Sequence, residues 1–179
     1  MEHVITEKRT LVHRGSIVDV YSDDMLLPNG NHEVWDYVEH RMGAVCALPV
    51  LPNGKIVMVK QYRHALERYT IEVPAGSRDS VDEDTLICAT RELEEETGYT
   101  SDNIEFLLSL KTTVAFCNES IDVYLARDLK PGKQHLDEAE SINVLEMELD
   151  ELLDMIYAGE LQDSKTVSAI LAYANKIKR

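Results

Sequence analysis

The sequence is short of cysteine and of cations, and each shortage excludes a class of protein. Its three cysteines, Cys46, Cys88 and Cys117, are odd in number and far apart, which argues against a disulfide framework or a zinc site and favours a reducing cytoplasm. Lys and Arg total 18, whereas Asp and Glu total 33, so the formal net charge is −15. A chain this acidic repels the phosphates of nucleic acids and of anionic lipids, and we expect neither as a partner.

Long apolar runs, glycine and proline are scarce as well. The longest mainly apolar stretch, residues 43–52, is far shorter than the ~20 residues that a membrane helix needs, and the first nine residues contain no apolar signal core. We therefore expect a cytoplasmic protein. With 8 glycines, 5 prolines, 44% hydrophobic and 28% charged residues, the composition of the 179 residues is that of a globular protein rather than a disordered or collagen-like one.

The first forty residues have the pattern of a small antiparallel β unit. A strong turn at residues 28–31 (Pro-Asn-Gly-Asn) separates segments in which polar and apolar residues alternate. We assign residues 1–42 to this N-terminal β unit and residues 43–179 to a larger domain. The alternation predicts strands at residues 17–21, 24–27 and 32–40.

A second hairpin is predicted directly after this unit. Residues 44–51 form a continuous apolar run, the turn Pro-Asn-Gly-Lys follows at residues 52–55, and residues 56–62 have a strand pattern, which together indicate a buried β-hairpin. The later segments predict an α+β fold, in which helices pack against a mixed sheet. We expect strands at residues 104–110, 120–126 and 144–148, and helices at residues 80–98, 148–158 and 165–178.

The helix predicted at residues 80–98 has signals at both ends. Ser80 and Glu83 have the spacing of a capping box, which places the start of the helix there. Gly98 stands where a left-handed residue is wanted after the last turn. Between these ends, Arg91 can form an i, i+4 ion pair with Glu95.

Four carboxylates lie within five residues of this helix, at residues 92–96. Glu92 and Glu96 are i, i+4 neighbours and Glu95 is i+3 from Glu92, so all three can face one point. Like charges at this spacing cost ~0.2–0.5 kcal/mol per pair, whereas a divalent cation would turn the repulsion into ligation. Mg²⁺ prefers oxygen donors of this kind. The other interpretation is a solvated acidic face.

The segment from Gly76 to Tyr99 resembles the Nudix box, the signature of hydrolases that cleave nucleoside diphosphates linked to another moiety. Six residues instead of five separate Gly76 from Glu83, which leaves open whether Glu83 or Asp82 fills the first acidic position. From Glu83 onward, the sequence matches every specified position, ending in Arg91-Glu92-Leu93-x-Glu95-Glu96-x-Gly98-Tyr99.

The resemblance extends beyond the box to the ADP-ribose pyrophosphatase branch of the family. It includes residues 59–63 (Val-Lys-Gln-Tyr-Arg), residues 71–76 (Ile-Glu-Val-Pro-Ala-Gly) and the N-terminal strands with their turn. One departure is Thr-Val-Ala at residues 113–115, where many relatives carry Ser-Pro-Gly. The resemblance implies a Nudix-like α/β/α sandwich with a mixed sheet, plus the small N-terminal antiparallel unit.

The resemblance also implies a metal site and a general base. The metal ligands would be the backbone oxygen of Ala75 with Glu92 and Glu96, and Glu95 would be a secondary ligand with a share in catalysis. The expected metal is Mg²⁺, and Mn²⁺ is a possible substitute. A base must take a proton from the attacking water. The acidic loop after the box supplies either Glu140 or Glu138 for this role.

Four further residues are implied as substrate contacts. Arg63 would bind the diphosphate, since its guanidinium forks onto phosphate oxygens and an acidic chain needs a local cation for such a ligand. Glu72 would lie near the adenosine ribose, and Gly76 would line the site. Trp35 has two interpretations: it packs in the core, or it stacks on adenine across a homodimer interface formed by the N-terminal strands.

The implied function is Mg²⁺-dependent hydrolysis of the pyrophosphate bond of a nucleoside diphosphate derivative, with ADP-ribose split into AMP and ribose 5-phosphate. The alternatives are another nucleotide sugar, NADH or a dinucleoside polyphosphate as the substrate, or a non-catalytic module that binds nucleotides. Because we expect Glu96 to be exposed and repelled by its neighbours, its replacement by Gln should remove turnover and barely change stability.

Overall fold

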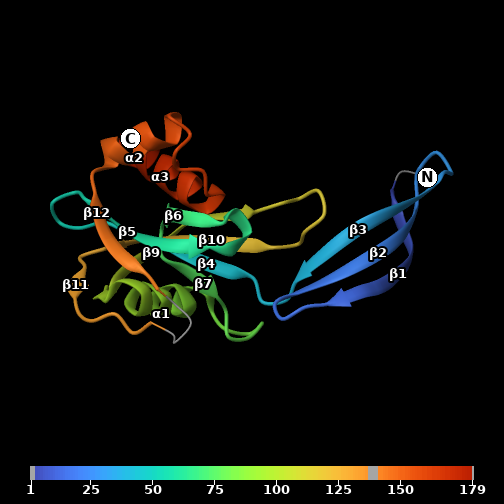
Figure 1. Ribbon diagram of the computed structural model, residues 1–179, viewed down its shortest axis with the longest axis horizontal. Helices are drawn as coiled ribbons and strands as arrows, with labels where there is room; N and C mark the ends of the chain where they lie inside the picture. Colours follow the sequence, from blue (N-terminus) through green and yellow to red (C-terminus); the bar gives the residue numbers. More distant parts are fainter. Residues whose placement is uncertain (1–2, 137–140, 179) are drawn as a thin grey trace.

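The computed structural model describes residues 3–136 and 141–178 and has an elongated shape (Figure 1). A three-stranded antiparallel sheet forms one end, and the helices surround the remaining strands at the other end. The sheet order is β1-β2-β3. Its strands are β1 (Ile5–Arg14), β2 (Val18–Leu26) and β3 (His32–His40).

The sequence pattern missed β1 and wrongly divided β2 into two short strands. Polar residues in the middle of β2 do not end the strand, because β1 supplies partners for them. Asp23 is only 4% exposed, and Arg9 on β1 donates two hydrogen bonds to its carboxylate, at 2.8 and 2.6 Å. The same guanidinium lies 4.0 Å from the ring centre of Tyr37 on β3. The Arg9–Asp23 ion pair therefore stabilises the middle of β2, where the sequence pattern of a strand would have an apolar residue.

Besides a short two-stranded sheet, the larger part contains two sheets in place of the predicted second hairpin. Residues 52–55 do form a turn, which a single antiparallel bridge between Val50 and Ile56 closes. Beyond that bridge, β4 (Ala44–Pro49) and β5 (Ile56–Arg63) belong to different sheets, so the prediction that they pair as a hairpin was wrong. One sheet has the order β7-β4-β10-β9 and is mixed, since β4 and β10 run parallel. The other has the order β12-β5-β6 and is antiparallel. The remaining strands are β6 (Arg68–Glu72), β7 (Ala75–Ser77), β8 (Tyr99–Thr100), β9 (Asn103–Lys111), β10 (Ser120–Arg127), β11 (Lys130–Pro131) and β12 (Asn143–Met147).

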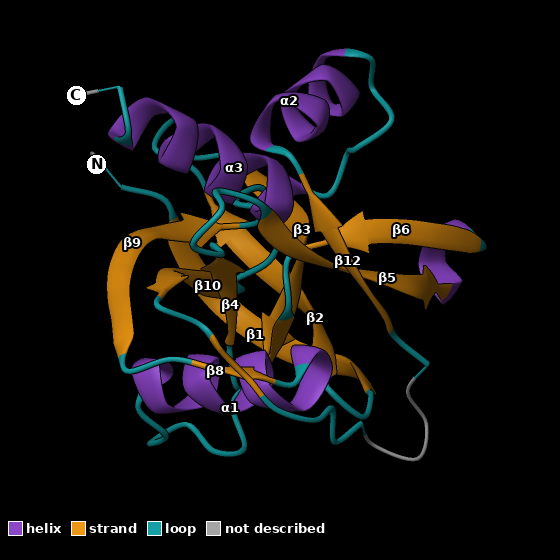
Figure 2. Cartoon of the chain, turned by 90° about the vertical axis from the view of Figure 1, so that its left-hand side faces the viewer, coloured by secondary structure: helices purple, strands orange, loops and turns teal. Residues whose placement is uncertain are grey.

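Helices cover both faces of the central strands (Figure 2). Helix α1 (Thr85–Thr97) lies on one face, and α2 (Leu149–Tyr157) and α3 (Ser164–Lys176) lie on the other. This arrangement confirms the predicted α+β class with a Nudix-like α/β/α sandwich. No helix among the described residues is long and apolar enough to cross a bilayer.

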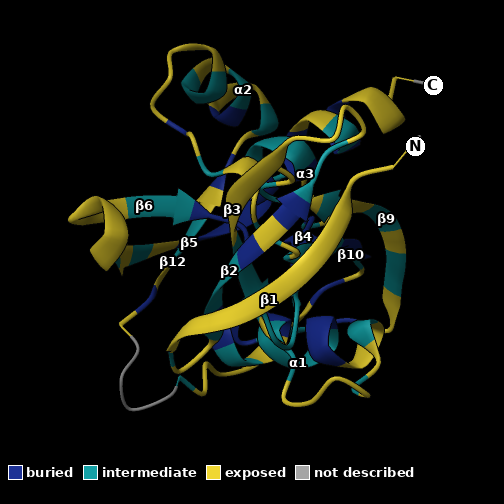
Figure 3. Ribbon diagram, turned by 90° about the vertical axis from the view of Figure 1, so that its right-hand side faces the viewer, coloured by how far each residue is buried: buried dark blue, intermediate teal, exposed yellow. Residues whose placement is uncertain are grey.

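Strand β4 has a continuous apolar run because it is buried on both faces, in contrast to β1, which is exposed along its whole length (Figure 3). Cys46 and Leu48 pack in a core cluster with Ile170 of α3. The alternating residues Val45 and Ala47 pack on the side of α1. Burying a side chain of this size contributes about 1.5–3 kcal/mol, so β4 anchors both layers.

Helix α1 begins later than predicted and ends as predicted. Its N-cap is Asp84, whose carboxylate accepts hydrogen bonds from the amides of Leu86 and Ile87 at 2.8 and 3.4 Å, so the capping box at Ser80 was wrong. Asp is as good an N-cap as Ser, and residues 78–84 are used as a loop instead. Gly98 has φ of 75°, the left-handed conformation that the C-cap requires.

Candidate active site

Two carboxylates of α1 lie against consecutive residues of β7. The Ala75 amide donates a hydrogen bond to Glu96 Oε2 at 2.9 Å. A Cβ placed on Gly76 would lie 2.1 Å from the Glu92 carboxyl carbon, so only glycine allows that carboxylate to approach the strand. The pairing of a strand glycine with helix glutamates thus brings the oxygens of Glu92 and Glu96 to one strip of backbone.

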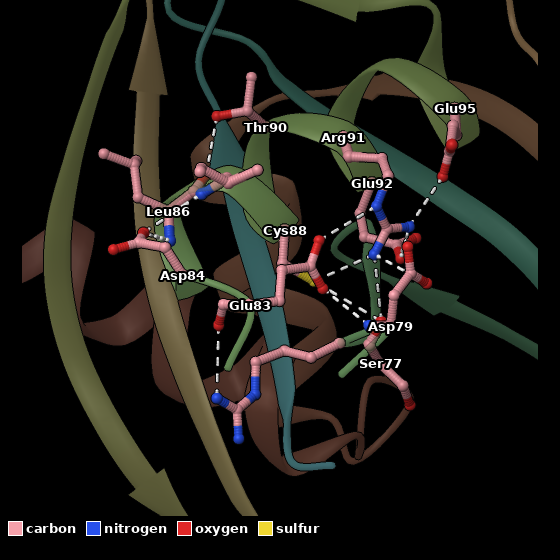
Figure 4. A network of polar contacts seen from close by, with 12 residues as sticks. Ser77, Asp79, Glu83, Asp84, Leu86, Cys88, Thr90, Arg91, Glu92 and Glu95 are labelled. Atoms are coloured by element: carbon pink, nitrogen blue, oxygen red, sulfur yellow. Dashed lines mark hydrogen bonds and ion pairs between the residues drawn. The ribbon is translucent and has the colours of Figure 1, made fainter. Parts of the chain in front are cut away.

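Arg91 holds the acidic ridge together (Figure 4). Its Nη1 donates to Glu92 at 2.6 Å and to Glu95 at 3.1 Å, which confirms the predicted i, i+4 pair. Its Nη2 donates to the carbonyl oxygen of Ser77 at 3.3 Å, and its Nε lies 3.5 Å from Glu83. Burial lowers the pKa of Arg91, but the charge of Glu92 and the other acids raise it above its ordinary value. The guanidinium therefore stays charged and limits the repulsion along the helix.

Glu83 occupies the interior of the loop before α1. Its Oε2 accepts a hydrogen bond from the Asp79 amide at 2.7 Å, which holds the pKa of the Glu83 carboxyl below its ordinary value. Its other oxygen faces Arg91. Glu83 thus links the loop before α1 to Arg91, whereas the side chain of Asp82 is exposed.

Glu96 is 3% exposed, so the expectation of an exposed side chain was wrong. Helix α1 packs its buried face closely on β7. The Glu96 carboxylate therefore accepts the hydrogen bond of the Ala75 amide, in place of a carbonyl oxygen of a neighbouring strand. Replacement of Glu96 therefore has a structural consequence that the sequence pattern did not indicate.

The donor atoms at β7 fit a hard cation with few protein ligands. Within residues 3–136 and 141–178, no group of three or more His, Cys, Asp and Glu side chains has a metal-binding arrangement, and Glu95 turns toward Arg91. Mg²⁺ usually takes only one or two carboxylates and completes its shell with water and substrate phosphate. Glu92 and Glu96, with the Ala75 carbonyl as the third predicted ligand, would form such an all-oxygen set.

Arg63, beside the turn of the β5–β6 hairpin, forms a fork-to-fork ion pair with Glu72, which is at the other end of β6. Arg63 Nε and Nη2 donate to the two oxygens of Glu72 at 2.7 and 2.6 Å. Thr70 Oγ1 donates to the same carboxylate at 2.6 Å, and Lys165 Nζ donates at 2.5 Å. Burial alone would raise the pKa of Glu72, but the hydrogen bond from Arg63 and the charge of Lys165 lower it to about 2. Glu72 is thus a buried anion shared by two cations.

A cleft of ≈ 380 Å³ connects this ion pair with the box. Arg63 lines one part of it, and Ala75 and Gly76 line another. Thr113, from the segment that departs from the Ser-Pro-Gly of many relatives, and Glu119 line it as well. The cleft therefore brings Arg63, the predicted diphosphate contact, and Ala75, one of the predicted metal ligands, to a common space, while Glu92 and Glu96 lie against its Ala75–Gly76 wall and do not line it themselves.

Trp35 lies away from this cleft, on β3, and is 46% exposed, which is contrary to its interpretation as a core residue of the single chain. It lines an open hollow of ≈ 660 Å³ together with Val34, Val38 and Phe116. Glu138 and Glu140, the predicted bases, lie outside the described residues.

The sequence analysis missed two charged residues at the start of α3. Lys165 is 7% exposed and bonds to Glu72 and, at 2.9 Å, to Asp163, the N-cap of the helix. A lysine near a helix start gives no signal of burial, because its partner Glu72 is 93 residues away in the sequence.

Comparisons with known proteins agree with the resemblance to the Nudix box. A family model described as the NUDIX domain matches residues 40–169. The chain is 41% identical over 167 residues to the methanol dehydrogenase activator of Bacillus methanolicus, covering 92% of this chain and 89% of the relative. It is 40% identical over 161 residues to the ADP-ribose pyrophosphatase of Bacillus subtilis (strain 168), covering 89% of this chain and 86% of the relative.

A solved structure confirms the fold independently of close sequence identity. The crystal structure of an ADP compounds hydrolase superposes with a TM-score of 0.88 at 23% identity, covering 98% of this chain and 94% of that chain. The box residues, the α/β/α sandwich and the matched family model agree with one another. The chain belongs to the Nudix family and is a Nudix pyrophosphohydrolase.

Proposed function

We propose that the protein hydrolyses ADP-ribose to AMP and ribose 5-phosphate in a Mg²⁺-dependent reaction. The observation that carries the proposal is the shared cleft, in which Arg63 lies on one side and the Ala75–Gly76 backbone, against which Glu92 and Glu96 pack, lies on the other. The ADP-ribose pyrophosphatase of Bacillus subtilis, at 40% identity, supports the choice of substrate.

In the proposed reaction, a cationic side chain would bind the diphosphate and acidic side chains would bind the metal. Arg63 presents a guanidinium to the diphosphate, and the side of it that does not contact Glu72 remains for substrate oxygens. Glu92, Glu96 and the Ala75 carbonyl hold Mg²⁺, and Glu95 contributes as a secondary ligand. When bound, Mg²⁺ neutralises charge on the phosphates and lowers the pKa of water.

The reaction is an in-line displacement at phosphorus. A water oxygen forms a bond to one phosphorus, the bond from that phosphorus to the bridging oxygen breaks, and the leaving phosphate keeps the bonding electrons. Glu140 or Glu138 accepts the proton from the attacking water. Gly76 lines the space in which the phosphates lie, and Glu72 holds Arg63 and borders the ribose.

A second substrate class is favoured by one observation. Thr113 lines the cleft in place of the Ser-Pro-Gly segment of many relatives, so the contact with the second half of the substrate differs. A relative named GDP-mannose pyrophosphatase, 29% identical over 167 residues, is consistent with another nucleotide sugar as the substrate. NADH, nucleotide sugars and dinucleoside polyphosphates are the alternatives.

A substrate panel with Mg²⁺ and Mn²⁺ tests the proposal. Released phosphomonoester is measured for ADP-ribose, GDP-mannose, NADH and a dinucleoside polyphosphate. We expect ADP-ribose to have the highest kcat/KM and the reaction to stop when the metal is chelated. A preference of more than ~100-fold, about 2.7 kcal/mol, for another compound refutes ADP-ribose as the main substrate.

We also propose a cytoplasmic homodimer in which residues 1–42 form the interface. Strand β1 is exposed along its whole length, and the hollow around Trp35 combines Val34, Val38 and Phe116 into an apolar surface. Exposed apolar patches of this kind often mark protein interfaces. In the dimer, Trp35 would stack on the adenine bound by the partner subunit.

A further inference from the structure

The first turn of α3 contacts the active-site cleft from behind, through side chains that have no place in the proposed chemistry. Lys165 bonds to Glu72, and Thr166 Oγ1 accepts a hydrogen bond from the Val73 amide at 3.0 Å. Both partners precede Ala75 and Gly76 by only a few residues. Asp163 caps the helix and accepts hydrogen bonds from Lys165 and Thr166. The turn therefore fixes the segment that leads into the box.

The first turn of α3 also determines the net charge of the ion-pair cluster that contains Arg63. Arg63, Glu72, Lys165 and Asp163 form a chain of alternating signs, and the four formal charges sum to zero. Glu72 is 2% exposed and Lys165 7% exposed, so water screens this inner pair little. Without Lys165, two carboxylates would oppose one guanidinium, and the cluster would carry a charge of −1.

The outer cation of this chain faces the cleft. Arg63 lines both the ≈ 380 Å³ cleft and a second cavity of ≈ 650 Å³, which lies between β6 and the segment joining α2 to α3. Asp163 and Lys165 also line both spaces. The attraction between Arg63 and a bound diphosphate thus depends on the nearby negative charges. Glu72 and Asp163 weaken this attraction to the extent that Lys165 does not neutralise them.

We propose that Lys165 is a positioning residue for substrate binding: by sharing Glu72 with Arg63, it fixes the guanidinium of Arg63 and leaves its positive charge available to the diphosphate. This inference rests on the proposed function, because it assigns Lys165 to the binding of that substrate. Lys165 acts through Glu72 and Arg63 and does not contact the reacting phosphorus.

Kinetics of Lys165→Met test the inference, since Met keeps the length of the side chain and removes the charge. We expect KM for ADP-ribose to rise at least ten-fold while kcat stays within three-fold, which separates binding from chemistry. Lys165→Arg restores the cation and should return KM to within three-fold of wild type. Lys176→Met is the matched control, because it removes one exposed lysine from the same helix, and its KM should not change.

A double-mutant cycle distinguishes positioning from a general structural role. If Lys165 acts through Arg63, then Lys165→Met changes KM less than two-fold when Arg63 is already Ala. Equal effects of Lys165→Met in both backgrounds overturn the inference. An unchanged KM in the Lys165→Met single variant, with normal wild-type turnover, overturns it as well and leaves the proposed function intact.

Asp163→Asn keeps the inference testable if Lys165→Met does not fold. Asn caps helices as well as Asp does, so α3 retains its start, but the cluster gains a net charge of +1. We expect KM to fall at least two-fold, whereas a role limited to folding predicts no improvement. A higher KM refutes the charge argument. Absence of turnover by the wild-type enzyme on every compound of the panel refutes the proposed function and this inference together.

Discussion

The buried carboxylate of Glu96 has one observed contact and one proposed role, and its replacement separates them. It accepts the hydrogen bond of the Ala75 amide, and it is a proposed ligand of Mg²⁺. Glu96→Gln keeps an oxygen that can accept the bond and removes the negative charge. Glu96→Ala removes both. The two variants therefore should differ in stability and agree in lost turnover.

The size of each effect follows from the contacts. Leaving the Ala75 amide without an acceptor costs about 1–3 kcal/mol, which Glu96→Ala should show as a fall in Tm of roughly 2–12 °C for a chain of this length. Glu96→Gln should keep Tm within about 4 °C. Loss of a residue that supports a metal site typically costs 10–100-fold in activity, so a direct ligand should cost roughly 100-fold or more in kcat for both variants.

Thermal unfolding with and without Mg²⁺ gives a readout that does not depend on activity. A metal at about 100 times its Kd adds about 2.7 kcal/mol to the folded state, so wild-type Tm should rise by roughly 5–11 °C, while Glu96→Gln should rise little. Glu94→Gln is the matched control, because it removes the same charge from an exposed position of the same helix. Its turnover and its response to Mg²⁺ should equal those of wild type.

Two results would refute this reasoning. If Glu96→Gln keeps more than about a tenth of wild-type kcat, Glu96 is not a ligand on which the reaction depends. If Glu96→Ala unfolds at the wild-type temperature, the hydrogen bond to Ala75 contributes nothing to stability, and the close packing of α1 on β7 has no energetic role.

Three further predictions concern strand β7, the buried acid and the N-terminal surface. Gly76→Ala places a Cβ 2.1 Å from the Glu92 carboxyl carbon and must displace that side chain, so turnover should fall about 10–100-fold with Tm within about 4 °C; a fully active variant argues against the role of Glu92. The pKa of Glu72 is lowered from 4.5 to about 2, so its charge stabilises the fold above about pH 4.5, and about 3 kcal/mol is lost as pH falls toward 2. Urea unfolding should therefore depend less on pH in this range for Glu72→Gln than for wild type, and parallel curves contradict the assignment. Trp35→Ala removes an exposed anchor of the apolar hollow, so sedimentation should show a shift from dimer to monomer, and a monomeric wild type excludes the proposed interface.

The features that the sequence predicted correctly depend on neighbouring residues. The box helix ends at Gly98 because its left-handed conformation is a local property, and the pair of Arg91 with Glu95 needs only one helical turn. The strands in the core also followed from composition, since a run buried on both faces must be apolar throughout.

The features that only the tertiary structure decided depend on residues far apart in the chain. Whether β4 and β5 pair with each other or join different sheets is set by the strands that compete for their edges, and the turn between them is compatible with both. Glu96 became buried because β7 offered an amide 21 residues away, and Lys165 became buried because Glu72 lay opposite it. Charged residues acquire such roles through partners that local spacing does not specify. The sequence thus determined the reaction class through one helix, and the tertiary structure determined which charged residues line the cleft.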